Sequence, residues 1–140
     1  MSPEAVARTW FKEVWDEGDE SALDRLMAND GVAHGLAGGD IVGPAAFKPY
    51  FRAMRQALGD LAIEIVQTVT EGDRVAVHCR VRARHVGATL GGPATDRPVT
   101  FEGITICRIR NGQIVEGWNT FDFLSMYQQL GWVANPPMPA

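Results

Sequence analysis

Several features that would assign a protein to a broad class are missing from this sequence. No apolar run approaches the roughly 20 residues that a membrane-spanning helix requires, and the first residues, MSPEAVARTW, lack the segments of a secretory signal. The formal net charge of −4 comes from charges of both signs spread along the chain, without the basic stripe that a phosphate backbone requires. We therefore expect a cytoplasmic protein that binds neither membrane nor nucleic acid.

Cysteine is also scarce. The two cysteines, Cys79 and Cys107, fall within strand-like segments, and their spacing matches no metal site. We expect two reduced thiols and no bound metal.

The first part of the sequence has helical patterns. A length of 140 residues suits one core, and we expect a single domain over residues 1–140. Ser2 and Pro3 begin a helix whose apolar residues recur at helical spacing, a second helix starts at Ser21, and a third starts at Gly43. Residues 31–43, between the second and third helices, predict two short strands around a glycine turn.

After Gly59 the apolar residues alternate. Segments 61–70, 74–86, 99–110 and 113–121 predict four long antiparallel strands, and residues 123–131 a last helix before a Pro-rich tail at 133–140. Asn111-Gly112 is typical of a two-residue type I′ hairpin. The predicted fold is α+β: a cone-shaped, curved antiparallel sheet of about six strands wrapped on three to four helices, with an internal apolar pocket.

The tight hairpin predicts which side chains face inward. It pairs Ile106 with Gly117, Ile104 with Asn119 and Glu102 with Phe121, and we expect this more apolar face to line the cavity. Trp118 and Cys107 then face outward. On the preceding strand, Cys79 and His85 alternate with an outward arginine row, so the two cysteines should lie on opposite faces without a disulfide.

Polar side chains on this face are the candidate catalytic groups. Glu102 could act as a general base with a raised pKa, His34 and His85 could carry protons near pH 7, and Asn119 could donate a hydrogen bond. Asp122 follows the last strand and is either the N-cap of the last helix or a substitute base. The residues expected to bind the substrate are Trp10, Val14, Tyr50, Phe51, Met54, Cys79, His85, Ile104, Ile106 and Phe121.

The sequence resembles the SnoaL-like polyketide cyclase family of the nuclear transport factor 2-like superfamily. The resemblance covers about residues 5–131 and includes FKEVWDEGDESALDRLMANDGVAHG, GPAAFKPYFRAMRQALGDL, EGDRVAV, RNGQIVEGW and FDFLSMYQQLG. It implies a cone-shaped α+β fold, often dimeric, and an intramolecular aldol closure by an acid–base aspartate without metal or organic cofactor. Such relatives tend to read His-Trp-Asp where this chain has Gly117-Trp118-Asn119.

Two other relatives fit less well. An epoxide hydrolase would need carboxylates flanking an arginine, one of them at Asn119, and ketosteroid isomerase would need a tyrosine on the first helix. Three functions stay open. The first is an enzyme that transfers a proton at a carbon atom of a small apolar carbonyl compound, with His34 or Glu102 as base and catalytic roles for Asn119 and Asp122. The second is a non-catalytic binding protein for a hydrophobic ligand, and the third is a partner-binding scaffold with a filled core. We expect a homodimer that buries Trp118 on the outer sheet face.

Overall fold

The computed structural model describes residues 1–36, 38–135 and 137, so half of the predicted tail at 133–140 lies outside the described residues. The helices are α1 (Pro3–Thr9), the π-helix η1 (Trp10–Asp16), α2 (Ser21–Leu26), α3 (Gly43–Ala57) and α4 (Phe123–Gln129). The strands are β1 (Met27–His34), β2 (Ile41–Val42), β3 (Leu58–Glu71), β4 (Arg74–His85), β5 (Pro98–Arg110) and β6 (Gln113–Phe121). Every predicted helix and strand is present.

The predicted first helix consists of two kinds of helix. Ser2 accepts a hydrogen bond from the backbone N–H of Ala5, as its N-cap position requires, and Pro3 begins α1. From Trp10 onward the chain winds into η1, and its end is closed by a bond from the Glu17 N–H to the Lys12 carbonyl. π-helical segments are rare and occur often at functional sites.

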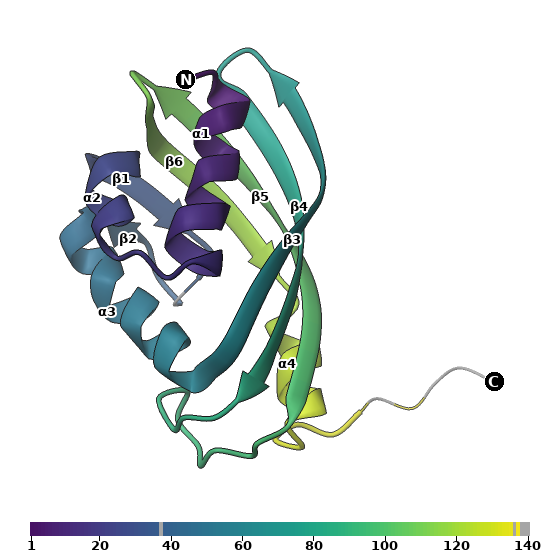
Figure 1. Cartoon of the computed structure of the whole chain (residues 1–140). Helices are drawn as coiled ribbons and strands as arrows, with labels where there is room; N and C mark the ends of the chain where they lie inside the picture. The colour runs from purple at the N-terminus through teal and green to yellow at the C-terminus, as the bar shows by residue number, and fades with distance from the viewer. Residues whose placement is uncertain (37, 136, 138–140) are drawn as a thin grey trace.

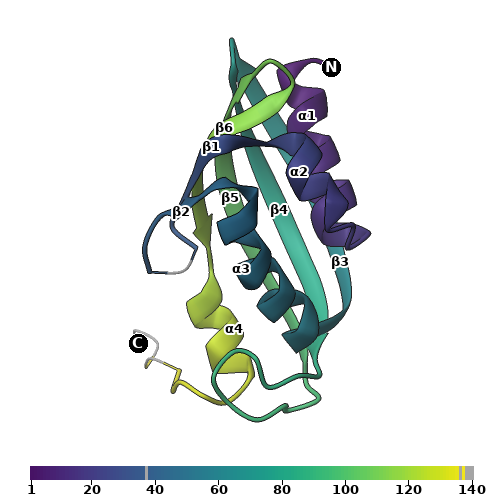
Figure 2. The same cartoon turned by 90° about the vertical axis from the view of Figure 1, so that its left-hand side faces the viewer.

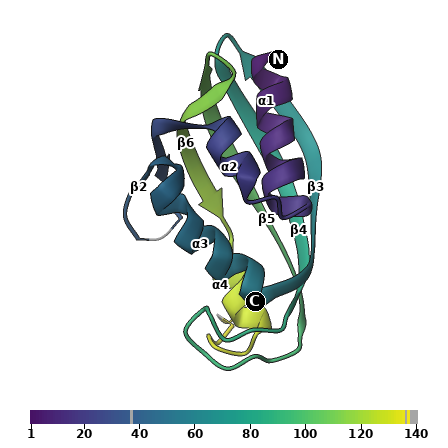
Figure 3. The same ribbon diagram turned by 60° about the vertical axis from the view of Figure 1, so that its left-hand side comes forward.

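The six strands form one sheet in the order β2-β1-β6-β5-β4-β3. β1 and β6 are parallel and the other pairs are antiparallel, so the sheet is mixed rather than wholly antiparallel. Figure 1 shows α1 and α3 against one face of the curved sheet, with α4 at the end of the molecule opposite the N-terminus. In Figures 2 and 3 the long strands β3 and β4 bend around these helices. The expected cone-shaped α+β architecture is confirmed.

The β5–β6 register differs from the prediction by one residue. Asn111 and Gly112 have φ values of 53° and 74°, as the type I′ hairpin requires, and Arg110 pairs with Gln113. A β-bulge follows, however, because Ile109 pairs with Ile114 whereas Arg108 pairs with Glu116, which leaves Val115 as the extra residue.

The bulge reverses the predicted faces of β5. Glu102, Ile104 and Ile106 lie on the outer face, where the two isoleucines are 50% and 40% exposed. Thr105 and Cys107 lie on the inner face and are buried. Beyond the bulge, the predicted faces of β6 hold: Gly117, Asn119 and Phe121 face inward, and Trp118 faces outward, paired with Ile106 and His34.

The prediction of two free thiols is correct, but the two cysteines do not lie on opposite faces of the sheet. Cys79 and Cys107 are both free and both buried on the inner face. Burial raises the pKa of each thiol to about 12, so neither is a thiolate at neutral pH. No helix among the described residues is long and apolar enough to cross a membrane.

Candidate functional site

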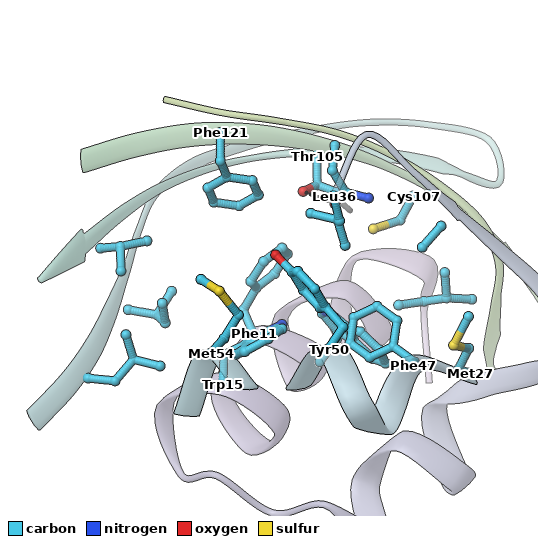
Figure 4. A pocket seen from close by; sticks show the side chains of 18 of the residues that line it. Phe11, Trp15, Met27, Leu36, Phe47, Tyr50, Met54, Thr105, Cys107 and Phe121 are labelled. Atoms are coloured by element: carbon cyan, nitrogen blue, oxygen red, sulfur yellow. Dashed lines mark hydrogen bonds between the residues drawn. The ribbon is translucent and has the colours of Figure 1, made fainter. Parts of the chain in front are cut away.

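The inner face of the sheet and the helices η1 and α3 border a cavity of about 80 Å³ (Figure 4). Its lining is almost wholly apolar. The described lining residues are Trp10, Phe11, Trp15, Met27, Val32, Ala33, Leu36, Phe47, Tyr50, Met54, Leu58, Leu61, Ile63, Val81, Phe101, Thr105, Cys107, Ile114, Gly117, Asn119, Phe121 and Phe123. The cavity has the composition of a site for an apolar small molecule.

The helical wall of the cavity is aromatic. Trp10 meets Phe47 of α3 edge to face, with ring centroids 5.3 Å apart, and Trp15 meets Tyr50 at 6.1 Å. In an α-helix Trp10 and Trp15 would not share a face, but a π-helical turn is wider, so residues five apart return to the same side. η1 thereby brings both tryptophans to the cavity. The Arg55 guanidinium donates to the Trp15 carbonyl over 2.8 Å at the C-terminal end of this segment.

Asn119 and Thr105 form a polar pair on the sheet side. The Thr105 hydroxyl donates to Oδ1 of Asn119 over 2.8 Å, and Nδ2 of Asn119 donates to the backbone carbonyl of His34 over 2.9 Å. A carbonyl oxygen can only accept, so the amide nitrogen must face His34 and the amide cannot be flipped. One N–H of Asn119 is then left for a ligand.

Tyr50 provides the polar atom opposite this pair. Figure 4 shows its side chain reaching from α3 into the cavity with the oxygen directed toward the sheet. No hydrogen bond between described residues involves this hydroxyl, which borders the cavity. Burial raises the pKa of the Tyr50 phenol, so it stays protonated and can donate to a ligand oxygen.

Two of the predicted bases lie outside the cavity. Glu102 accepts from Arg80 on the outer face, with His78 also within 3.2 Å of its carboxylate, so its predicted position in the cavity is wrong. His34 also lies on the outer side of the sheet, with its ring stacked on Trp118 at a centroid distance of 5.7 Å. Only its backbone carbonyl reaches the cavity side, through Asn119.

His34 lies between two carboxylates. Its Nε2 is 2.7 Å from Glu116 and its Nδ1 is 2.8 Å from Asp40. The bond to Glu116 is the largest cause that raises the pKa of His34, followed by the bond to Asp40. The same contact with His34 lowers the pKa of Glu116, with Arg108 assisting.

Asp122 and His85 lie outside the cavity and make structural contacts. Asp122 is exposed, and its Oδ1 accepts from the backbone N–H of Ser125 over 2.9 Å, so the N-cap interpretation is confirmed. His85 faces inward as predicted, but it is wholly buried away from the cavity, with Nδ1 accepting from the Thr95 N–H. Its Nε2 has no hydrogen-bond partner in the described part of the chain, and the ring meets Trp132 edge to face.

The other predicted binding residues divide into two groups. Trp10, Tyr50, Met54 and Phe121 line the cavity together with Asn119. Val14, Phe51 and Cys79 are buried in the core but are not among the lining residues, and Ile104 and Ile106 lie outside.

The sequence prediction missed Trp15, Thr105 and Cys107. Trp15 falls off the α-helical stripe and is recovered only by the π-helix, whereas the bulge hides the other two.

The cavity has no ionised group in the described lining. None of its residues carries a carboxylate, an imidazole, an ammonium or a guanidinium group. Within the described ranges, no group of three His, Cys, Asp or Glu side chains is arranged to hold a metal ion. The site can therefore desolvate an apolar molecule and donate hydrogen bonds to its oxygens, but its own side chains offer no general base.

The curved sheet, its covering helices and the apolar cavity between them define an α+β protein with an internal pocket. The family model of the SnoaL-like polyketide cyclases matches residues 5–130. The aklanonic acid methyl ester cyclase DauD of Streptomyces sp. (strain C5) is 31% identical over 150 residues, covering 99% of this chain and 93% of its own. The nogalonic acid methyl ester cyclase of Streptomyces nogalater is 32% identical over 117 residues, covering 83% and 84%.

Solved structures agree with this relationship. The wild-type IdmH structure from Streptomyces antibioticus superimposes with a TM-score of 0.81 at 27% identity, covering 94% of this chain and 99% of its own. A SnoaL-like protein from Jannaschia sp. CCS1 gives a TM-score of 0.85 at 19% identity, covering 96% and 93%, and supports the fold alone. The chain belongs to the SnoaL-like polyketide cyclase family.

Proposed function

We propose that this protein is a cyclase that closes a ring in an apolar, polyketide-like carbonyl compound held in the cavity. The observation that carries the proposal is the cavity, in which an aromatic wall faces the polar side chains of Tyr50, Thr105 and Asn119. The relationship to two methyl ester cyclases indicates the class of substrate.

The reaction is an intramolecular aldol closure. A carbon next to one carbonyl group loses a proton and forms a bond to the carbon of a second carbonyl group, whose oxygen takes up a proton, so the product is an isomer of the substrate. Tyr50 and the free N–H of Asn119 donate hydrogen bonds to the oxygens on which negative charge develops. The aromatic wall holds the substrate folded, with the reacting carbons in contact, which lowers the entropic part of the barrier.

The proton that leaves carbon is not taken by a side chain of the cavity. His34 and Glu102 lie on the outer face, and no described lining residue is a carboxylate or an imidazole. Water or a phenolate of the substrate itself takes this proton. Asn119 then acts as a hydrogen-bond donor in place of an acid–base group.

The test is incubation of the purified protein with aklanonic acid methyl ester and nogalonic acid methyl ester. Chromatography should detect a product of unchanged mass, and NMR should detect a new carbon–carbon bond. Tyr50→Phe should lower kcat by about 10²-fold, because it removes a donor to the developing oxyanion. Equal rates with and without the protein for both esters and for related β-keto compounds would reject the proposal.

A second candidate function is a binding protein that holds such a compound without transforming it. The absence of a general base from the described lining is the specific observation that favours it. This function predicts that a ligand co-purifies with the protein, or that the esters bind tightly, while none of them is cyclised. Mass spectrometry of the denatured protein, followed by a binding titration and the cyclisation assay, separates the two functions.

We also propose a homodimer through the outer face of the sheet. The apolar row Val69, Ala76, Ile106 and Trp118 crosses four neighbouring strands on this face. Arg74 lies over the Trp118 ring at 5.3 Å, and charges of both signs border the row, so two copies can pair around a two-fold axis. Two free buried thiols suit the reducing cytoplasm, which we propose as the site of action.

A further inference from the structure

Neither the backbone conformation nor the packing of the cavity wall requires a glycine at position 117. Gly117 is buried on the inner face of β6, and its φ is not in the left-handed region. A Cβ atom added there would have one neighbour within 4 Å, Nδ2 of Asn119 at 3.8 Å. Gly103, on the neighbouring strand, differs because a Cβ atom there would overlap the ring of Phe121. The missing side chain at Gly117 therefore leaves open volume in the cavity.

The amide of Asn119 borders this volume with a donor. Nδ2 uses one hydrogen in the bond to the His34 carbonyl, and the Thr105 hydroxyl occupies Oδ1, which fixes the orientation of the amide. The second hydrogen of Nδ2 is left over, and Nδ2 is the nearest heavy atom to the position where a side chain of residue 117 would begin. A buried donor without a partner costs free energy unless a ligand or a water molecule satisfies it.

We propose that Gly117 opens a specificity subsite in the cavity, which takes a carbonyl or hydroxyl oxygen of the ligand and presents it to Nδ2 of Asn119. The subsite rests on the proposed function, because it presupposes that the cavity binds an oxygenated apolar molecule. The subsite specifies which part of the ligand the protein recognises: an oxygen substituent at the edge of the ligand that faces β6. A side chain at residue 117 would occupy the place of that oxygen.

The experiment measures binding of two planar probes, 1,8-dihydroxyanthraquinone and anthracene, by quenching of tryptophan fluorescence. Trp10 and Trp15 line the cavity and report occupancy. The variants are Gly117→Ala and Gly117→Val. Gly39→Ala is the matched control, because Gly39 is exposed, is not in the left-handed region and has nothing within 4 Å of an added Cβ atom. Thermal unfolding of every variant is recorded in parallel.

The wild type and Gly39→Ala should bind the anthraquinone about tenfold more tightly than anthracene, which corresponds to one good hydrogen bond. Gly117→Ala should abolish this preference, and Gly117→Val should abolish binding. Gly117→Ala should unfold at or above the wild-type temperature, because the substitution lowers the entropy of the unfolded chain and the added Cβ atom meets no clash.

Three results would overturn the subsite. The first is a Gly117→Ala variant that keeps the wild-type preference, which would mean that the space holds only water. The second is a lowered unfolding temperature in that variant, which would mean that the space does not exist. A wild type that binds neither probe would overturn the proposed function itself, and the subsite with it.

Discussion

At the scale of single residues, the orientation of Asn119 determines what the cavity can do. Its Nδ2 lies 2.9 Å from the His34 carbonyl, an atom that only accepts hydrogen bonds. An ionised aspartate at this position would place a carboxylate oxygen against that carbonyl. At position 119 the cavity therefore has a hydrogen-bond donor and no acid–base group.

Asn119→Asp is expected to carry a carboxyl group with a raised pKa, because only its protonated form can donate to His34. A carboxyl whose pKa is raised by folding contributes stability below its unfolded pKa of about 3.9, and this stability is lost as pH rises through the folded pKa. The variant should therefore lose stability relative to the wild type between pH 4 and pH 8. Urea unfolding across this range measures the difference, and a constant difference would contradict the assigned amide orientation.

His34 should make the stability of the protein depend on pH above about 6.5. Only the protonated ring can donate to both Glu116 and Asp40, and its pKa is raised by Glu116 first and by Asp40 second. The stability that these bonds contribute is complete below about pH 6.5 and is lost as pH rises through the folded pKa. The advantage of the wild type over His34→Gln should therefore shrink as pH rises above 6.5.

Unfolding midpoints of the wild type, His34→Gln and Glu116→Gln between pH 5.5 and pH 9 check this expectation. Glu116→Gln should flatten the pH dependence, since it removes the largest cause of the raised pKa. An advantage of the wild type over His34→Gln that stays constant, or that grows with pH, would contradict the assignment.

At the scale of elements, most of the secondary structure could be predicted and one register could not. Glycine, proline and capping signals identified the helices and the Asn111-Gly112 turn, because these residues impose local backbone geometry. The bulge at Val115 left no signal, since Ile114 and Val115 are both apolar and either can face a core. One extra residue moved Glu102 to the outer face and Thr105 and Cys107 to the cavity.

The role of Asp122 in α4 gives a prediction that separates structure from catalysis. Asp122→Ala should cost about 1 kcal/mol of unfolding free energy, because the Ser125 N–H loses its acceptor. Asp122→Asn should keep the cap and the stability of the wild type. Chemical denaturation measures the cost, and both variants should retain full cyclase activity. Loss of activity in Asp122→Asn at unchanged stability would restore Asp122 as a catalytic candidate.

At the scale of the whole molecule, the proposed dimer makes the outer apolar row testable. Ile106 is 40% exposed in the single chain and lies beside Trp118. Ile106→Lys should convert the dimer into a monomer, because it places a charge in the interface, and it should leave the fold intact. Sedimentation velocity compares it with Leu124→Lys, which changes a 56% exposed leucine on α4. A wild type that sediments as a monomer would reject the dimer.

The sequence predicted the apolar lining of the site but not which of its groups could act as an acid or a base. The aromatic helices, a curved sheet and the family motifs predicted an apolar cavity bordered by Asn119 and Tyr50. The π-helix that turns Trp15 inward has no recognisable pattern in the sequence. The positions of the candidate bases depended on the register, so the cavity without a base became visible only with the three-dimensional arrangement.

The most direct measurement compares kcat/KM for ring closure in the wild type, Tyr50→Phe and Glu102→Gln. Tyr50 donates into the cavity and Glu102 lies on the outer face, so the first variant should lose about 10²-fold and the second should be unchanged. A large loss in Glu102→Gln together with full activity in Tyr50→Phe would contradict the assignment of the cavity as the site of reaction.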